Sequence, residues 1–378
     1  MDTTSLPNVV FGQATTADQH SQCNTLAATA FSAPLTEAAY LEAQRYLGER
    51  PLTRDGGWRV WFLAPADDPA REVLATCRTI RRDLLLRDAR SSRTERGYCV
   101  AGVATAPRWR RRGLASRLLE HVKTWLDGPG EAAASMLSTS IGDVGTPHPL
   151  FYANRGWRPL VPVYQATLAC PPRRRLHGTL GDIPRGRPIA DEELGRLCIA
   201  DVEDVKREFT TLAAGPGDVH VAVLPTPELI GWLHDRGDFV AQKTLGRVPG
   251  HHGAISECGR LWLYWYHDFR KEQLGIQRVR LPPRLDGDGG DDHDVVIRRL
   301  AGLLHKALEE AEEWGFPKVV VWEPTAAVVE AMGVLSRRAG VSVRTEERIG
   351  RSIPSLRFRA DDTPSSVHFH MKELYMWS

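Results

Sequence analysis

The chain has 378 residues, of which 42% are hydrophobic and 25% charged, the composition of an ordinary globular protein. Its 49 lysine and arginine residues nearly balance 47 aspartate and glutamate residues, which argues against a dedicated nucleic-acid-binding protein. No apolar run approaches the roughly 18 residues that span a bilayer, and the N-terminal residues lack a signal-peptide pattern. The six cysteines form no CxxC pair, as expected for thiols in a reducing compartment. We therefore expect a cytoplasmic protein without a membrane or nucleic-acid partner; the oligomeric state is left open.

The length favours two domains, and the first half alternates helices with strands. Apolar spacing and turn residues predict where each element lies. Helices are expected at 14–32, 35–47, 114–125 and 149–154, and strands at 58–63, 73–78, 97–104, 136–141 and 160–168. The last of these strands is expected to complete one α/β sheet, so that the first domain comprises residues 1–168.

Residues 171–188 are rich in proline, glycine and arginine, which predicts a linker over 169–190. The second domain, 191–378, repeats the order of elements in the first. Its helices are expected at 191–212, 227–245, 294–313 and 326–339, and its strands at 260–267, 277–281, 318–322 and 367–377. This order predicts a second α/β domain and is compatible with a degenerate copy of the first fold.

The most informative segment is the strand-to-helix connection at 103–120. An apolar strand is followed by a loop with three arginines, a glycine and an amphipathic helix. Helix-terminal N–H groups and the helix dipole bind phosphate, and glycine lets a ligand approach the backbone. A nuclear-localisation or nucleic-acid patch is the alternative, but a free basic tail would not continue into apolar positions such as Leu118 and Leu119. The expected cofactor-binding residues are Val103, Ala104, Thr105, Arg110, Arg111, Arg112, Gly113, Leu114, Ala115 and Ser116.

The spacing Arg110-x-x-Gly113-x-Ala115, between an apolar strand and a helix, resembles the acyl-CoA loop of the GNAT superfamily of N-acyltransferases. The resemblance implies a mixed sheet with helices on both faces and acetyl-CoA as co-substrate. It also implies that the backbone of residues 103–105 binds the pantetheine arm and that the loop holds the pyrophosphate. The Ser116 hydroxyl would add a further contact.

A second motif, at 150–157, follows the predicted strand at 136–141. It resembles the GNAT pattern in which a tyrosine on a short helix faces the cofactor sulfur. Carried over to this chain, Tyr152 would be the general acid that protonates the departing thiolate. A phenol with a pKa near 10 is protonated at neutral pH and can donate. Phe151 and Trp157 are better interpreted as core aromatic residues.

The segment 367–378 resembles the terminal signature of the fungal lysine N-acetyltransferase family, in which an N-terminal GNAT domain carries a second domain. Further matches lie at 232–241, 253–256 and 262–265, whereas residues 371–375 depart from the family's usual order. The resemblance implies acetylation of the side-chain amine of free lysine, or of a lysine-like metabolite, by direct transfer. A secondary-metabolite amine, a protein amine and a non-catalytic CoA-binding protein are the alternatives.

The acceptor side is less clearly marked. The acidic run at 286–294 would repel pyrophosphate, so only the first half is expected to hold the donor. A cationic amine needs a carboxylate partner, and Glu373 in the tail is the candidate, with packing of the tail as an edge strand as the alternative. Asp143 and His148 are candidate general bases acting through water, and Cys99 is a less favoured nucleophile.

No metal site is expected. The adjacent histidines at 251 and 252 lie in a segment flanked by proline and glycine. Neighbouring histidines on such a loop are more often exposed than bound to a metal. The cysteines also lack the spacing of a zinc site.

Overall fold

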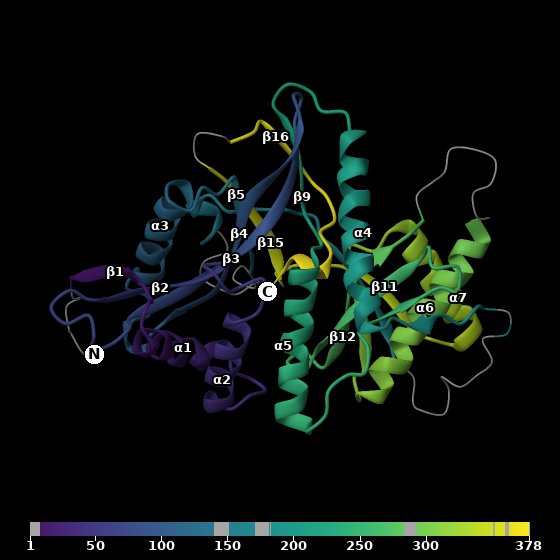
Figure 1. Ribbon diagram of the computed structural model, residues 1–378, viewed down its shortest axis with the longest axis horizontal. Helices are drawn as coiled ribbons and strands as arrows, with labels where there is room; N and C mark the ends of the chain where they lie inside the picture. The colour runs from purple at the N-terminus through teal and green to yellow at the C-terminus, as the bar shows by residue number, and fades with distance from the viewer. Residues whose placement is uncertain are drawn as a thin grey trace.

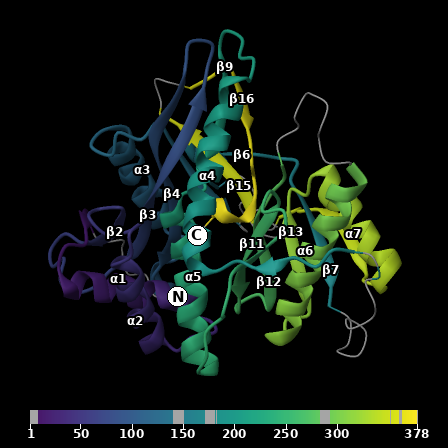
Figure 2. The same cartoon turned by 45° about the vertical axis from the view of Figure 1, so that its right-hand side comes forward.

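The computed structural model describes residues 8–139, 151–170, 181, 183–282, 293–350, 352–359 and 363–377. These residues form two mixed β-sheets with helices packed around and between them (Figure 1). Two long helices, α4 (Asp191–Thr210) and α5 (Pro227–Leu245), lie between the sheets in both ribbon views (Figure 1 and Figure 2). No helix within the described residues is long and apolar enough to cross a membrane.

The first sheet is built mainly from the N-terminal half of the chain. Its strands lie in the order β1 (Val9–Gln13), β2 (Trp58–Pro65), β3 (Ala75–Arg87), β4 (Ser92–Thr105), β5 (Ala134–Thr139), β15 (Ile353–Phe358) and β6 (Arg158–Pro159). Beside this row, β9 (Asp218–Val223) pairs with the end of β3, and β16 (Ser366–Phe369) pairs with β9. Pairing is parallel for β4 with β5 and for β9 with β16, and antiparallel for the other pairs.

The helices of the first half that pack on the first sheet are α1 (Ala17–Phe31), α2 (Glu37–Gly48) and α3 (Leu114–Asp127). One side of α3 is apolar at the three- and four-residue spacing of a helix face, and its buried residues are Leu114, Leu118, Leu119, Val122 and Leu126. This stripe packs with Tyr98 and Val100 of β4, whereas Cys99 packs with residues of α5. Since neighbouring strand residues point to opposite faces, α3 and α5 lie on opposite faces of the first sheet.

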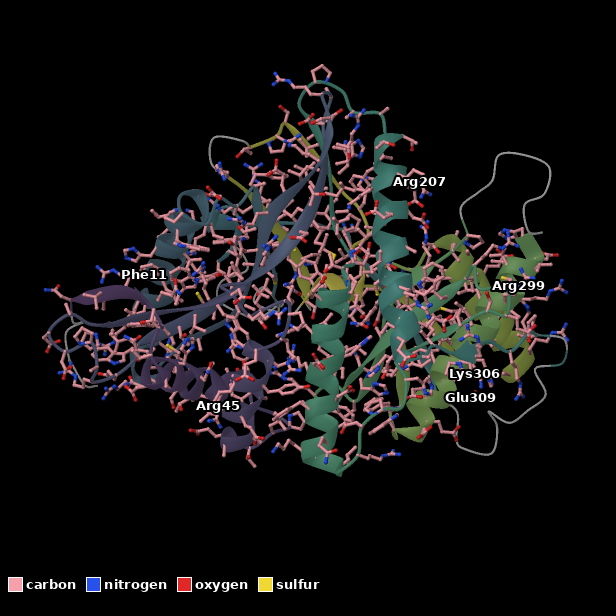
Figure 3. All side chains as sticks on the ribbon, viewed as in Figure 1. Phe11, Arg45, Arg207, Arg299, Lys306 and Glu309 are labelled. Atoms are coloured by element: carbon pink, nitrogen blue, oxygen red, sulfur yellow. The ribbon has the colours of Figure 1, made fainter. Side chains whose placement is uncertain are left out.

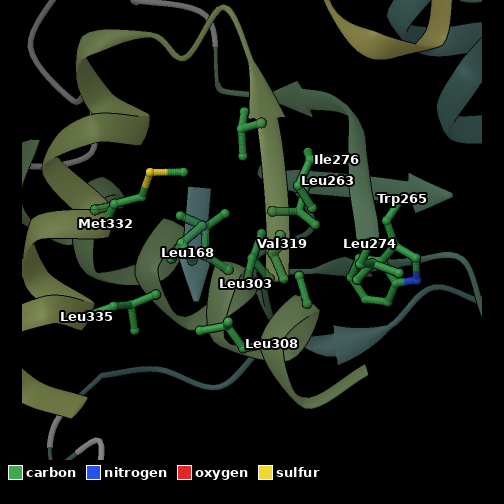
Figure 4. Packing of buried hydrophobic residues seen from close by; sticks show 14 of the residues in the cluster. Leu168, Leu263, Trp265, Leu274, Ile276, Leu303, Leu308, Val319, Met332 and Leu335 are labelled. Carbon is green, nitrogen blue, oxygen red and sulfur yellow. The ribbon is translucent and has the colours of Figure 1, made fainter. Parts of the chain in front are cut away.

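The second sheet has the order β14 (Val343–Glu347), β7 (Tyr164–Ala169), β13 (Lys318–Trp322), β12 (Gln273–Arg280), β11 (Trp262–Asp268), β10 (Gly253–Ile255) and β8 (Arg187–Pro188). Helices α6 (His293–Glu313) and α7 (Ala326–Ala339) pack against it. In this core, Leu308 of α6, Met332 and Leu335 of α7 and Val319 of β13 belong to one buried cluster (Figure 4). The chain thus has the predicted α/β class, with two mixed sheets and helices packed on them.

The two sheets exchange strands. The strand predicted at 160–168 does not complete the first sheet: as β7, it pairs antiparallel with β13 and β14 of the second sheet. In return β15, from the C-terminal half, pairs antiparallel with β5 and β6 of the first sheet. The prediction was wrong because the apolar pattern of a strand specifies its faces but not its neighbour.

Several element bounds also differ from the expectation. The predicted strand at 277–281 begins four residues earlier, at Gln273. The expected strand at 367–377 ends at Phe369, and a short 3-10 helix, η4 (Leu374–Met376), follows it. Residues 171–180 and 182 of the predicted linker, and 286–292 of the acidic run, lie outside the described residues.

Candidate active site

β4 and β5 separate after a short paired stretch. They pair in parallel only at residues 97–99 with 134–136, although β4 continues to Thr105 and β5 to Thr139. The separated ends line a cleft of about 590 Å³, together with the α1–α2 turn, α5 and the β11–β12 turn. The cleft therefore lies between the first sheet and elements of the second half.

β4 carries a bulge at this cleft. Thr76 of β3 pairs with Ala104, whereas Arg78 pairs with Ala101, so β4 has one residue more than β3 between the two pairs. Gly102 has a φ of 62°, and a Cβ at this position would lie 2.9 Å from Nε of Arg78. Glycine is therefore required here. The isolated glycine in an apolar strand was the signal for the bulge, and sequence reasoning missed it.

The basic loop leads directly into α3. Arg111 and Gly113 have φ angles of 61° and 82°, and Gly113 is the N-cap of α3, without a side-chain cap hydrogen bond. A Cβ at Gly113 would have no other heavy atom within 4 Å beyond its chain neighbours. The first N–H groups of a helix lack helical partners, and this end of the dipole is positive. The geometry suits a phosphate group, and assignment of the loop to the pyrophosphate stays a prediction.

The other predicted donor-site residues differ in accessibility. Val103 lines the cleft, whereas Ala104 and Leu114 are buried. Arg110 is exposed, and its Nε donates to the Thr105 carbonyl at 3.2 Å. This contact ties the basic loop to the end of β4.

Arg155 connects the start of α3 to the segment that carries the candidate acid. Its guanidinium donates to the Ser116 hydroxyl and to the Phe151 carbonyl, and lies 4.0 Å from the centre of the Phe151 ring. Ser116 therefore already accepts a hydrogen bond within the protein. Nearby, Arg112 lies 5.1 Å from the centre of the Trp109 ring. Sequence reasoning did not single out Arg155, because its role depends on a contact 39 residues away.

Tyr152 immediately precedes the 3-10 helix η2 (Ala153–Arg155), is 8% exposed and lines the cleft. Its ring packs edge-on against Phe151, with centroids 4.9 Å apart. Its hydroxyl forms no hydrogen bond within the described part of the chain. Burial raises the pKa of Tyr152 above its ordinary value, and Cys77 adds to the rise. The phenol is therefore protonated at neutral pH, as a proton donor must be.

The cleft holds one carboxylate among the residues that the structure describes, that of Asp268 at the end of β11. Asp268 is 7% exposed and accepts a hydrogen bond from the Lys271 backbone N–H at 3.1 Å. Sequence reasoning did not select it, because nothing local marks a carboxylate that reaches a cleft between the two halves.

Glu373 does not line this cleft, contrary to its predicted contact with the acceptor. Its carboxylate accepts from Nη1 of Arg278 at 2.5 Å and from the Val279 N–H at 3.2 Å. Arg278 also donates to both carboxylate oxygens of Asp201. Burial raises the pKa of Glu373, and the nearby Arg278 opposes the rise. Through these contacts, Glu373 holds the C-terminal tail, the residues that follow β16, against β12.

The tail also fills the gap beyond the parallel pair of the second sheet. β12 and β13 pair at residues 274–276 with 319–321, and Glu373 bonds to β12 just beyond this stretch. Within the paired stretch, the tail also packs closely on β12, because a Cβ at Gly275 would lie 2.3 Å from a methyl carbon of Leu374. The equivalent gap in the first sheet is the cleft. This arrangement supports the prediction that only the first half holds the donor.

The predicted bases and nucleophile are not brought together by the described structure. Asp143 and His148 lie outside the described residues. Cys99 lines the cleft but is buried, with its Sγ 4.0 Å from the Val100 carbonyl oxygen. Its role as a nucleophile gains no support.

The adjacent histidines at 251 and 252 each contact a different carboxylate. His251 lies 3.1 Å from Glu310, and His252 lies 2.9 Å from Asp238. Within the described ranges, no group of three or more His, Cys, Asp and Glu residues is placed to hold a metal ion.

Two protein-family models match the chain. The model described as the LYC1 GNAT-like C-terminal domain matches residues 169–378. The model of the acetyltransferase (GNAT) family matches residues 25–144. A search of curated proteins returned no match.

Several solved structures share the fold. A probable N-acyltransferase from Enterococcus faecalis V583 has 12% identity and a TM-score of 0.54, over 94% of this chain and 74% of that one. A GCN5-related N-acetyltransferase from Kribbella flavida has 14% identity and a TM-score of 0.52, over 94% and 72%. A tandem GNAT protein from the clavulanic acid biosynthesis pathway has 13% identity and a TM-score of 0.50, over 93% and 99%. At such identities the likeness concerns the fold alone.

Proposed function

Because the chain belongs to the family defined by the LYC1 GNAT-like C-terminal domain and carries a GNAT acetyltransferase domain before it, we propose that it transfers an acetyl group from acetyl-CoA to the amine of a small molecule. Lysine or a lysine-like metabolite is the first acceptor to test. The observation that carries the proposal is that the separated ends of β4 and β5 share one cleft with Tyr152, whose hydroxyl forms no hydrogen bond to any described residue.

The donor would bind along the first sheet. The open position at Gly113 and the N-terminal N–H groups of α3 suit the pyrophosphate. The pantetheine arm would extend over the backbone of residues 100–103 and 137–139, which line the cleft. Its thioester would then lie in the cleft that also contains the Tyr152 side chain. Such positioning of two reactants accounts for a large part of the rate in acyl transfer.

In direct transfer, the unprotonated amine attacks the thioester carbonyl, and a C–N bond forms while the C–S bond breaks. The nitrogen loses a proton and the departing thiolate gains one, so the proton count balances. Tyr152 is the proposed donor to the sulfur, because it is neutral, lines the cleft and has no competing hydrogen bond among the residues that the structure describes. General acid help of this kind contributes roughly 100- to 10,000-fold.

Two alternatives compete with a free amino acid as acceptor. A secondary-metabolite amine or a protein amine would use the same chemistry, and a CoA sensor would bind the donor without turnover. The distinguishing experiment measures CoA release with acetyl-CoA and a panel of amino acids, polyamines and lysine-containing peptides, with mass spectrometry of the products. A product 42 Da heavier than a small amine is the expected result of adding C2H2O. CoA binding without release for any amine would favour the sensor.

A further inference from the structure

Two cations on the second-half side of the cleft form no hydrogen bond or ion pair within the described residues, although Nζ of Lys271 lies 5.9 Å from the centre of the Trp322 ring. Arg236 of α5 and Lys271 of the β11–β12 turn both line the cleft. Neither side chain forms a hydrogen bond or an ion pair with any residue that the structure describes. The other two cations of the cleft are engaged: Arg78 donates to the Tyr40 hydroxyl at 3.1 Å, and Arg270 donates to a backbone carbonyl at 3.2 Å.

The charges of the cleft favour an anion. The described lining contains four cationic side chains and the single carboxylate of Asp268. Burial lowers the pKa of Lys271, the nearby Asp268 opposes this, and Arg236 adds to the lowering. Like charges that line one cleft repel each other, and a bound anion would relieve the repulsion.

A buried uncharged side chain that lines the same cleft is only partly hydrogen-bonded. Gln277 of β12 is completely buried and lines the cleft. Its amide Nε2 has no hydrogen-bond partner within the described residues, while its Oε1 lies 2.6 Å from Nε2 of His234. Buried polar groups are nearly always hydrogen-bonded, so this amide is a donor that a ligand in the cleft can use.

These groups lie apart from the expected phosphate site. α5 packs on the opposite face of the first sheet from α3, whose N-terminus follows the basic loop. Figure 1 shows α5 between the two sheets and α3 at the outer side of the first sheet. None of the residues from 104 to 116 lines the cleft. The cations at Arg236 and Lys271 are therefore left for the acceptor and not for the donor's phosphates.

We propose that Arg236 and Lys271 bind a carboxylate of the acceptor, so that the acetylated amine belongs to an amino acid or a related amino carboxylate. This inference rests on the proposed function, and it assigns specificity to second-half residues. The carboxylate would accept hydrogen bonds from the guanidinium and the ammonium, which are strong because both donors are charged. The distal amine of the acceptor would then extend toward Tyr152 and the thioester.

The test compares two acceptors that differ only in the carboxylate, L-lysine and cadaverine. We expect the parent protein to prefer lysine in kcat/KM by about tenfold or more, the size of effect that a charge-assisted contact gives. Arg236→Gln and Lys271→Gln should each lower kcat/KM for lysine by about tenfold while leaving cadaverine and the KM for acetyl-CoA unchanged. Arg207→Gln, on the exposed side of α4 (Figure 3), is the matched control and should leave both acceptors unchanged.

Calorimetric binding of lysine and cadaverine to the protein with CoA gives a readout that does not depend on turnover. Weaker lysine binding in the two variants, at an unchanged melting temperature, would support the carboxylate site. Equal use and equal binding of lysine and cadaverine by the parent would overturn it and leave acetyl transfer intact. A raised KM for acetyl-CoA in the variants would also overturn it. If no amine is turned over, the proposed function fails, and the binding comparison still decides the carboxylate site.

Discussion

Gly113 shows how a single residue can serve a ligand and the backbone together. Its φ of 82° suits glycine, it precedes α3 as the N-cap, and the space where a side chain would stand is open. Tyr152 is the corresponding residue for the proposed chemistry, because its ring is buried and its hydroxyl forms no hydrogen bond within the described ranges of the chain. A substitution at Gly113 therefore tests donor binding, and one at Tyr152 tests proton donation.

Gly113→Asp should reduce acetyl-CoA affinity by about tenfold or more. It places a carboxylate at the positive end of α3, where the pyrophosphate is expected, and charges at a helix terminus interact by up to about 2 kcal/mol. Isothermal titration calorimetry with acetyl-CoA measures the effect. Gly113→Ala carries the backbone strain without the charge and should lose less affinity. Unchanged affinity in a folded Gly113→Asp protein would contradict the assignment of the loop.

Tyr152→Phe should lower kcat by about tenfold or more, with little change in acetyl-CoA affinity. The substitution keeps the ring and its packing against Phe151 but removes the proton. Single-turnover kinetics with a good acceptor isolates the chemical step. Tyr164→Phe, at a position 43% exposed and outside the cleft, is the control and should behave as the parent. An unchanged chemical rate would remove Tyr152 from the mechanism.

At the scale of elements, the tail joins the two sheets. The Tyr375 hydroxyl donates to the Val223 carbonyl of β9 at 2.6 Å, and Arg82 of β3 donates to the Met376 carbonyl at 3.4 Å. On the other side, Glu373 bonds to β12. The tail thus contacts strands of both sheets and contributes Leu374 to the wall of the cleft.

Glu373→Gln should therefore lower stability and leave acceptor kinetics unchanged. Glutamine keeps the size of the side chain but loses the charged contact with Arg278, which costs about 1–2 kcal/mol of unfolding free energy. Chemical denaturation and the KM for the amine are the two measurements. A raised KM for the amine at unchanged stability would restore the acceptor role that the sequence predicted.

A second contact between elements, that of α6 with β11, predicts a pH dependence. Glu310 accepts from Nε2 of His267 at 2.8 Å and lies 3.1 Å from His251. Burial alone would raise its pKa, but the bonds to the two histidines outweigh burial and lower the pKa to about 2. A lowered pKa stabilises the fold above the unfolded value near 4.3, and this stability is lost as pH falls toward 2.

In Glu310→Gln, the loss of stability relative to the parent should therefore shrink by about 1–3 kcal/mol between pH 4.5 and 2. Urea unfolding across this range measures the difference. Glutamine retains an oxygen for the Trp314 Nε1–H, which donates to Glu310 at 2.8 Å. A constant difference between the two proteins across the range would show that Glu310 keeps an ordinary pKa.

The sequence predicts elements well where the signal is local. The predicted bounds of α5, β13 and α7 agree with the structure, because Thr226 and Thr325 cap the two helices and a glycine ends each of them. β14 was missed because all of its residues after Val343 are polar, which leaves no alternation to detect. β9 was missed although its sequence alternates polar and apolar residues.

The site was predictable only in its local part. The loop, Gly113 and Tyr152 lie in short motifs, whereas the acceptor wall depends on contacts between distant segments. Asp268, Arg236 and Lys271 meet in the cleft only after the second half packs on the first sheet. No residue spacing within a short segment of the sequence indicates that packing.

At the scale of the whole molecule, the exchanged strands make each sheet depend on both halves of the chain. β7 lies in the second sheet and β15 in the first, so neither sheet can separate without losing strand pairing. We expect one cooperative thermal transition with equal calorimetric and van't Hoff enthalpies. A fragment of residues 1–170 should show no cooperative transition, because β5 then lacks β15. Two resolved transitions in the full chain would contradict this coupling.

The position of β15 in the chain also determines when β5 can be paired during synthesis. β5 ends at Thr139, but its neighbour β15 begins at Ile353, so the ribosome adds more than 200 residues before this edge can be covered. At 5–20 residues per second, the wait is about 10–40 seconds. During that time β5 presents an unpaired apolar edge, the kind of surface on which nascent chains associate. We therefore expect the protein to need a chaperone on the first sheet until translation passes β15, and to gain its cleft only after most of the chain has been made.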